Sequence, residues 1–263
     1  MGMGDLVEYE RTGGVVVLRL NRPEKLNAFS DEMVVALGEA LRRFDADGDA
    51  NVAVLCGKGR AFSSGADVNQ RQLRPREELE RMGGPQAHGA RAGDLFTHSV
   101  NWKPVITAVH GYVLGLAVGL MLDSDLTVAE AGTQMQITEV SRGLGGARYW
   151  ATMQFANAAA FGTELALSGR YFTAEEALEH GLINRVAEPG TTLDVALELA
   201  NQVDSNPPLS VRSAVRTRRW KLKRIMEEAD MQQSSLKLYL SEDFNEAARA
   251  RADRRDPNPF QGR

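Results

Sequence analysis

The fold is decided by the stretch Val105-Ile106-Thr107-Ala108-Val109-His110-Gly111-Tyr112-Val113-Leu114-Gly115. An apolar run leads into a polar turn that contains glycine, and further apolar residues follow up to Leu122. Residues 105–122 together reach the roughly 18 apolar residues that suggest a membrane helix, but the polar turn interrupts them and Asp123 ends them. We therefore predict a strand buried on both faces, a tight turn and a short buried helix, and no membrane span.

Similar apolar runs, which predict further buried strands, occur on both sides of this stretch at residues 15–20, 52–56 and 126–129. After Ser30, whose hydroxyl can cap a helix, apolar side chains recur with the i, i+3, i+4, i+7 spacing of a helix. The segment Thr173-Ala174-Glu175-Glu176 is a capping box, and the helix that it opens is expected to end at His180-Gly181. Residues 182–186 are then predicted to return as a strand.

The C-terminal part of the chain has a different character. Residues 194–203 predict a helix that Asn206-Pro207-Pro208 breaks, and residues 210–251 keep helical spacing with almost no glycine or proline. Strands alternate with helices only up to about residue 190. We therefore predict an α/β core over residues 1–195 and a helical region over residues 196–263.

Length and composition set limits on the class of protein. The chain has 263 residues and a net charge of −4, from 31 Lys and Arg against 35 Asp and Glu, so neither a nucleic acid nor an anionic membrane surface is an expected partner. Cys56 is the only cysteine, which excludes an intramolecular disulfide and favours a reducing compartment. The first residues lack the basic and apolar regions of a signal peptide, and we expect a cytoplasmic protein.

Three common kinds of catalytic site have little support in the sequence. The four histidines are far apart and show no metal-binding spacing, so no metal site is predicted. Ala61-Phe62-Ser63-Ser64-Gly65 differs by one residue from the nucleophile elbow of serine hydrolases, but a suitable acid and histidine are missing downstream. The cluster Gly143-Leu144-Gly145-Gly146 follows no strand directly, which argues against a dinucleotide site.

Two loops that follow buried strands remain as candidates. Phe62-Ser63-Ser64-Gly65-Ala66-Asp67-Val68 comes after the strand at residues 52–56, and Gly115 precedes the short helix after the strand at residues 105–109. Small residues leave backbone N–H groups able to face a ligand, and the second loop lies at a helix N-terminus. Two such donors on one oxygen would form an oxyanion hole. Spacing alone does not distinguish this arrangement from two ordinary glycine turns.

The sequence resembles the crotonase (enoyl-CoA hydratase/isomerase) superfamily. The motifs that carry the resemblance follow one another along the chain as Asn21-Arg22-Pro23-Glu24-Lys25-Leu26-Asn27-Ala28, Phe62-Ser63-Ser64-Gly65-Ala66-Asp67, Lys103-Pro104-Val105-Ile106-Thr107-Ala108-Val109-His110-Gly111, Leu167-Ser168-Gly169-Arg170-Tyr171-Phe172-Thr173-Ala174-Glu175-Glu176-Ala177 and Gly181-Leu182-Ile183-Asn184-Arg185-Val186. The resemblance implies a spiral of repeated ββα units, with C-terminal helices that assemble homotrimers, often paired into hexamers.

The resemblance also implies a binding site for an acyl-CoA substrate, with no cofactor beyond the coenzyme A of that substrate. The backbone N–H groups of Ser64 and Leu116 would bind the thioester oxygen; Leu116 stands where the family usually has glycine. The residues at the positions that hold the adenine and pantetheine are Lys25, Ala28, Ala66, Asp67 and Val68.

The acid–base residues decide which reaction the resemblance implies. Glu139 matches one of two glutamates used by the hydratases, whereas Gly119, which has no side chain, occupies the position of the other. Hydration of a double bond uses both carboxylates, but one carboxylate suffices to move a proton between two carbon atoms, as in the family's Δ3,Δ2-enoyl-CoA isomerases. Hydratase is the commonest activity of the family; isomerase and a non-catalytic acyl-CoA-binding protein are the alternatives.

Other notable residues are expected to be structural. Asp125 is predicted to bond to backbone at the start of a strand. The basic stretch at residues 212–224 is predicted to be a solvated helix face, with a contact to the coenzyme's phosphates as the alternative. Nearby methionine and leucine residues, among them Met226 and Met231, fit either an oligomer interface or the core. His88 and His98 fall in a variable segment and are not assigned a catalytic role.

Overall fold

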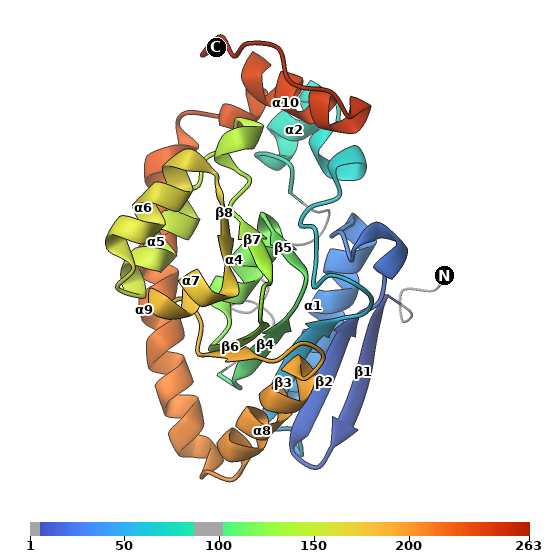
Figure 1. Cartoon of the computed structure of the whole chain (residues 1–263), viewed down its shortest axis with the longest axis vertical. Helices are drawn as coiled ribbons and strands as arrows, with labels where there is room; N and C mark the ends of the chain where they lie inside the picture. The colour runs from blue at the N-terminus through green and yellow to red at the C-terminus, as the bar shows by residue number, and fades with distance from the viewer. Residues whose placement is uncertain (1–5, 87–101) are drawn as a thin grey trace.

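The computed structural model describes residues 6–86 and 102–263, and its centre is a six-stranded sheet in the order β1-β2-β3-β4-β6-β9. β1 and β2 pair antiparallel, and the other neighbours pair parallel. The strands are β1 (Val7–Thr12), β2 (Val15–Leu20), β3 (Val52–Gly57), β4 (Val105–Val109), β6 (Leu126–Glu130) and β9 (Arg185–Ala187). Figure 1 shows the sheet in the lower half of the molecule, with β1 at its outer edge.

A second, three-stranded sheet lies above the end of β4 (Figure 1). It consists of β5 (Tyr112–Leu114), β7 (Gln134–Gln136) and β8 (Tyr171–Thr173), with β5 and β7 parallel and β8 antiparallel to β7. Only His110 and Gly111 separate β4 from β5, so the chain passes directly from the large sheet into the small one.

The large sheet is buried on both faces because helices cover each side. Along β3, Ala53 and Leu55 belong to one apolar cluster, whereas Val52, Val54 and Cys56 belong to the other, as the two-residue period of a strand requires. Helix α1 (Asp31–Ala46) packs into the first cluster and helix α8 (Thr192–Asp204) into the second. This explains why the strands are continuous apolar runs.

The remaining helices surround the small sheet and extend to the C-terminus. They are α2 (Arg76–Met82), α4 (Leu116–Asp123), α5 (Ala147–Phe155), α6 (Ala159–Ser168), α7 (Ala174–Glu179), α9 (Pro208–Ser234) and α10 (Glu242–Asp253). In Figure 1 the long helix α9 runs down the side of the molecule next to α5, and α10 lies at the top, in contact with residues 68–72. The C-terminal region therefore contacts both helix α5 and the segment that follows the loop at residues 62–68.

Most of the predicted elements are confirmed. The strands at residues 15–20, 52–56, 105–109 and 126–129 are present, and Ser30 caps α1 by accepting a hydrogen bond from the Met33 amide at 3.2 Å. Both hydrogen bonds of the Thr173 capping box are formed. The predicted end of α7 at His180-Gly181 is also confirmed.

Other predictions need correction. The strand expected at residues 182–186 begins only at Arg185, because the Leu182 amide donates to the Ala177 carbonyl at 2.8 Å and closes the end of α7. The three strands of the small sheet and β1 were not predicted. The division at residue 195 stays a prediction; that position lies in α8, which packs against the large sheet.

Candidate active site

The predicted site residues lie around one large pocket of about 960 Å³. Its walls come from the loop at residues 62–68, helix α4, the segment after β7 and the C-terminal helices. The structure brings all the residues predicted from the sequence to this pocket: Lys25, Ala28, Ser64, Ala66, Asp67, Val68, Leu116 and Glu139. They come from segments more than a hundred residues apart in the sequence, so the fold assembles the site.

The two loops singled out in the sequence are joined by backbone hydrogen bonds. The Leu114 amide donates to the Ser63 carbonyl and the Ser63 amide to the Tyr112 carbonyl, both at 3.1 Å. Gly65 lies at the point of closest approach, with φ +85°, and a Cβ on it would be 2.4 Å from the Leu114 carbonyl oxygen and 3.5 Å from the Leu116 nitrogen. Only glycine fits here, and its small size lets the first loop pass next to the N-terminus of α4.

The Leu116 amide is well placed to bind a ligand oxygen. Leu116 is the first residue of α4, where amides have no acceptor within the helix. Val118 and Gly119 both donate to the Gly115 carbonyl, at 2.8 and 3.2 Å. The Leu116 side chain packs partly buried against the core, so the larger residue at this position finds room without blocking its own amide.

The Ser64 amide, by contrast, is already engaged. It donates to the Leu26 carbonyl at 2.9 Å, and this is a correction to the predicted pair of unoccupied donors. The cause lies in the backbone of Leu26 and Asn27, which both adopt left-handed conformations with φ near +50°. The Asn27 side chain fixes this turn by donating to the carbonyls of Lys58 and Ala61, each at 2.9 Å.

Glu139 holds its carboxyl group in an unusual environment. Oε1 accepts a hydrogen bond from the Tyr149 hydroxyl at 2.7 Å, whereas Oε2 is buried and has no hydrogen-bond partner among the described residues. Burial raises the pKa of Glu139, and the hydrogen bond from Tyr149 opposes that rise. A Cβ on Gly115 would lie 3.4 Å from Oε1, so the carboxyl group is next to the N-terminus of α4. Glu139 thus lines the pocket with one oxygen held by Tyr149 and the other buried and unpaired among the described residues.

Gly119 faces Tyr149 of helix α5. A Cβ on Gly119 would lie 3.0 Å from Cε1 of the Tyr149 ring and 3.4 Å from its hydroxyl oxygen. Burial raises the pKa of Tyr149 well above 10, with the charge of Glu139 as the next cause, so the phenol stays protonated and donates. Asp123, one helical turn beyond Gly119 and about 6 Å further along α4, also lines the pocket and is buried.

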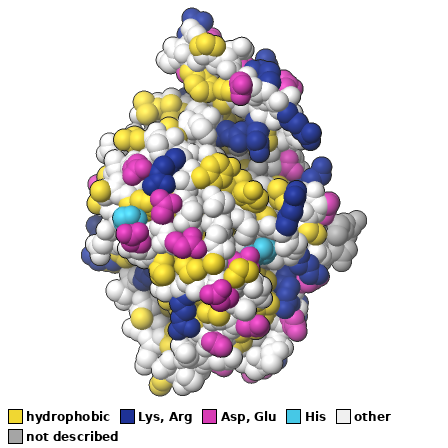
Figure 2. Space-filling view, viewed as in Figure 1, with side chains coloured by type: hydrophobic (Ala, Val, Ile, Leu, Met, Phe, Trp, Pro, Cys, Tyr) yellow, Lys and Arg dark blue, Asp and Glu magenta, His cyan; other side chains and the backbone are white. Residues whose placement is uncertain are grey.

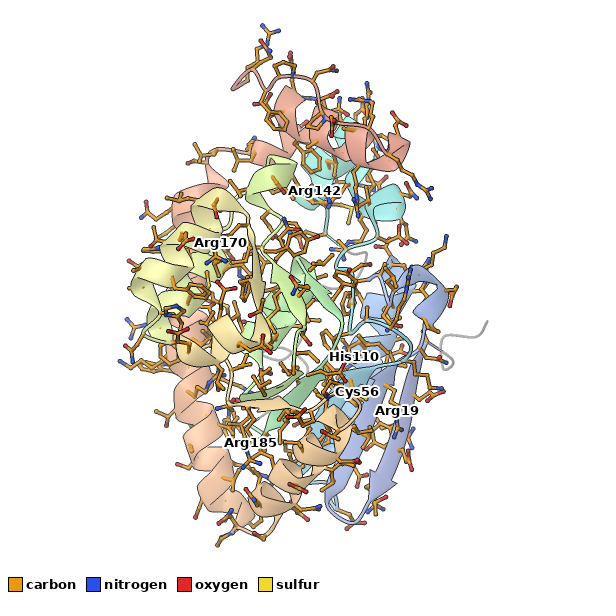
Figure 3. The ribbon with its side chains drawn as sticks, in the orientation of Figure 1. Arg19, Cys56, His110, Arg142, Arg170 and Arg185 are labelled. Atoms are coloured by element: carbon orange, nitrogen blue, oxygen red, sulfur yellow. The ribbon has the colours of Figure 1, made fainter. Side chains whose placement is uncertain are left out.

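The residues expected near the coenzyme contribute in different ways. Asp67 forms an ion pair with Arg22 at 2.8 Å and accepts from the Gln70 amide, so its carboxylate orders the loop. Lys25 is exposed at the mouth of the pocket. Two kinds of lining residue were not found from the sequence. Arg142 lies in the turn after Glu139, just below α10 in Figure 3. The others, such as Arg251, come from the C-terminal helices. They carry no local motif, because only the packing of α9 and α10 brings the C-terminus to the pocket.

The predicted solvated helix face at residues 212–224 is confirmed for Arg216, Lys221, Lys223 and Arg224, which are exposed, and is wrong for Arg219. Arg219 is buried and forms an ion pair with Asp125, and it also donates to the Lys103 carbonyl at 2.9 Å. No residue of the stretch lines the pocket. The predicted role of Asp125 is confirmed, since its Oδ2 accepts from the Val105 amide at 2.9 Å. Figure 2 shows charges of both signs interspersed over the visible face.

The other candidate sites gain nothing from the structure. The Ser63 hydroxyl is buried and donates to the Asn27 carbonyl at 2.8 Å. The described histidines lie elsewhere: His110 contacts the Gly59 carbonyl and His180 stacks on Phe161. His88 and His98 lie outside the described residues. Within residues 6–86 and 102–263, no acidic, cysteine or histidine cluster could hold a metal ion, and no helix is long and apolar enough to cross a bilayer.

Comparison with known proteins identifies the family. The model of the family described as enoyl-CoA hydratase/isomerase matches residues 10–262. The chain belongs to this family, the crotonase superfamily. Enoyl-CoA hydratase EchA19 of Mycobacterium tuberculosis is 33% identical over 261 residues, which cover 97% of this chain and 96% of that protein. The 1,2-epoxyphenylacetyl-CoA isomerase of Escherichia coli is 31% identical over 92% of this chain and 90% of its own.

The fold of the crotonase superfamily is confirmed by solved structures. A crystal structure of an enoyl-CoA hydratase from Mycobacterium avium subsp. paratuberculosis matches with a TM-score of 0.80 at 22% identity, covering 97% of this chain and 99% of the other. The two sheets and the long C-terminal helices are therefore the crotonase-like α/β fold. The predicted enzyme class, acting on acyl-CoA, is confirmed at the level of the family, whose members include both hydratases and isomerases.

Proposed function

We propose that this crotonase-family enzyme moves a proton between two carbon atoms of an enoyl-CoA thioester, shifting the double bond as a Δ3,Δ2-enoyl-CoA isomerase does. One observation carries the proposal: the carboxyl group of Glu139 lines the pocket with Oε1 held by Tyr149, while Oε2 is buried and has no partner among the described residues. At the position where the family's hydratases have a second glutamate, Gly119 has no side chain to offer.

The reaction uses the groups of the pocket in two steps. With the thioester oxygen at the Leu116 amide, the ionised Oε2 of Glu139 takes a proton from the α-carbon of a 3-enoyl-CoA, and the electron pair of that C–H bond forms an enolate. The same oxygen then returns the proton to the γ-carbon, which leaves a 2-enoyl-CoA and the original carboxylate. The positive end of α4 stabilises the enolate charge.

The coenzyme is proposed to bind along the first loop. The exposed ammonium of Lys25 suits a phosphate at the mouth of the pocket. Ala28, Ala66 and Val68 offer backbone and small side chains to the adenine and pantetheine, and the Arg22–Asp67 ion pair keeps this loop ordered. Ser64 becomes the second donor to the thioester oxygen when its amide exchanges the Leu26 carbonyl for the substrate.

The test is product analysis with both a 3-enoyl-CoA and a 2-enoyl-CoA. We expect a shifted double bond, and Glu139→Gln should lower turnover by about 10²–10⁴-fold, the usual contribution of a positioned acid–base group, while acyl-CoA affinity measured by calorimetry stays within a factor of about two. Full turnover by Glu139→Gln contradicts the proposal. Tight acyl-CoA binding without conversion of either substrate also contradicts it and favours a binding protein.

Hydration is the second candidate, and Asp123 is the observation that favours it. This buried carboxyl group also lines the pocket, and the curated relative EchA19 is named a hydratase. If Asp123 and Glu139 orient a water together, the 2-enoyl-CoA yields a hydroxyacyl-CoA, and Asp123→Asn lowers that yield without changing the isomerisation of a 3-enoyl-CoA. A hydroxyacyl product lost in Asp123→Asn would replace the isomerase proposal with this one.

Assembly and location are proposals as well. A homotrimer, or a dimer of trimers, in the cytoplasm is expected for this protein. Helix α9 supports an interface, because Leu209, Trp220 and Met231 on it are exposed by 78%, 54% and 66%, whereas Met226 is buried. Light scattering of the purified protein tests the assembly, and a monomer would contradict it.

A further inference from the structure

Tyr149 and Gly119 fit together as a pair. The ring of Tyr149 lies so close to Gly119 that any side chain at position 119 would meet it, since even a Cβ would be 3.0 Å from Cε1. Contacts of that length are tighter than most real Cβ contacts, and the obstacle is a ring rather than the end of a flexible chain. The space near Gly119 is therefore filled by an aromatic ring from α5, and a glutamate at this position could not be accommodated without moving it.

We propose that Tyr149 is a positioning residue, which replaces the missing second carboxylate and makes Oε2 of Glu139 the proton-transferring atom. The inference rests on the proposed proton transfer by Glu139. The phenol donates to Oε1 at 2.7 Å, while Oε2 has no partner among the described residues. Of the two equivalent oxygens of a carboxylate, one is thus bound and the other is buried without a partner among the described residues. Tyr149 need not touch the substrate to have this effect.

The same phenol also makes the carboxylate usable as a base. Burial raises the pKa of Glu139, and the hydrogen bond from the neutral phenol of Tyr149 lowers it by stabilising the ionised form. A second carboxylate at position 119 would do the opposite, because like charges raise each other's pKa. The other charged groups near this pair come from several elements: Arg71 of the turn Val68–Gln72, Asp123 of α4, Arg142 after Glu139, Arg148 of α5 and Asp230 of α9, which pairs with Arg148.

The first test is Tyr149→Phe, which removes the hydroxyl and keeps the ring. We expect kcat for isomerisation to fall about 10–100-fold, KM to change less than about twofold, and the acidic limb of the pH profile to move to higher pH, because Glu139 loses a hydrogen bond that favours its ionised form. The matched control is Tyr9→Phe. Tyr9 lies on β1, and its hydroxyl donates a hydrogen bond to the Asp47 carboxylate at 3.4 Å. That control should leave the profile unchanged.

An unchanged kcat and pH profile in Tyr149→Phe would overturn the inference. A fall in kcat with no movement of the acidic limb would also overturn it, because a hydroxyl with only a structural role would give that result. Either result leaves the proposed function standing as long as Glu139→Gln is inactive. If Glu139→Gln keeps full turnover, the proposed function itself fails, so the two failures are distinguishable.

The second test adds a side chain at position 119 and removes the ring at position 149. Gly119→Glu alone should give a poorly active enzyme, because the new side chain meets the Tyr149 ring. The double variant Gly119→Glu with Tyr149→Ala frees that space, and we expect it to hydrate a 2-enoyl-CoA at least about tenfold faster than either single variant. Hydration by Gly119→Glu alone at the rate of the double variant would show that the ring is no obstacle and would overturn the inference.

Discussion

The two sheets of the molecule differ in length, burial and task. In the large sheet, β2 and β3 have six residues each, and nearly all of their side chains are buried. In the small sheet each strand has three residues, of which only the middle one is buried: Val113, Met135 and Phe172. Yet the small sheet leads into Glu139, and the large sheet contributes only loops to the pocket.

The two sheets contribute differently to the stability of the fold and to the geometry of the pocket. The large sheet lies between two apolar clusters, and its strands supply side chains to both of them. The small sheet is too short to be stable alone, and its position depends on hydrogen bonds to the first loop and on three central side chains. Damage to the large sheet should therefore cost stability, whereas damage to the small sheet should cost activity as well.

The largest expected effect is at Gly65, where the first loop meets the small sheet. Gly65→Ala forces a Cβ to 2.4 Å from the Leu114 carbonyl at a positive φ, so the two loops must separate. We expect a loss of about 3 kcal/mol or more of the free energy of unfolding and no measurable acyl-CoA turnover. Urea unfolding and turnover measure the two effects.

Gly13→Ala is the matched control for that variant. Gly13 also has a positive φ, +59°, but no atom lies within 4 Å of a Cβ there. We expect only the backbone penalty, about 1 kcal/mol, with normal turnover. Equal losses in both variants would show that the close approach of the two loops contributes nothing.

The intermediate effect compares one core residue from each sheet. Leu55→Ala in β3 and Met135→Ala in β7 each remove a fully buried side chain, and each should cost about 2–5 kcal/mol of stability. Only Met135→Ala should also lower kcat, by about tenfold, because displacement of β7 moves Glu139 away from the reacting carbon. A larger fall in kcat for Leu55→Ala, measured where both variants are folded, would contradict the division of tasks between the sheets.

The smallest effect concerns the cost of keeping a carboxylate in the pocket. Burial raises the pKa of Glu139 above its ordinary value of 4.5. A raised carboxyl pKa favours the folded state below pH 4.5, and this contribution is lost as the pH rises through the folded-state pKa. Glu139→Gln should therefore unfold at a slightly higher temperature than the wild type at pH 7, and the difference should shrink below pH 4.5. A lower Tm for the variant at pH 7 would contradict the expected sign.

The sequence analysis predicted well what depends on neighbouring residues. Apolar runs identified the strands β2, β3, β4 and β6, because both faces of these strands are covered. The caps at Ser30 and Thr173 were found because a cap is a bond between residues three positions apart. The site residues found through the family motifs, including Glu139, also line one pocket.

The features that escaped prediction depend on distant parts of the chain. Three-residue strands show no periodicity, so the small sheet was missed. Gly119 indicates that a side chain is absent, but no local pattern shows that the Tyr149 ring, thirty positions later, fills its space. The bond from the Ser64 amide to Leu26 arises from two successive non-glycine residues with positive φ, which sequence preferences do not favour.

The position of Cys56 has a practical consequence. This thiol, the only one in the chain, lies in the apolar cluster between the large sheet and α8, and burial raises its pKa to about 11. The thiolate is the form that attacks alkylating reagents, so the native protein should stay unlabelled, and incorporation of a maleimide should report how often this layer opens. The rate of labelling at Cys56 would therefore measure local opening between the large sheet and α8. A cysteine introduced at the surface could be labelled selectively without removing the natural one.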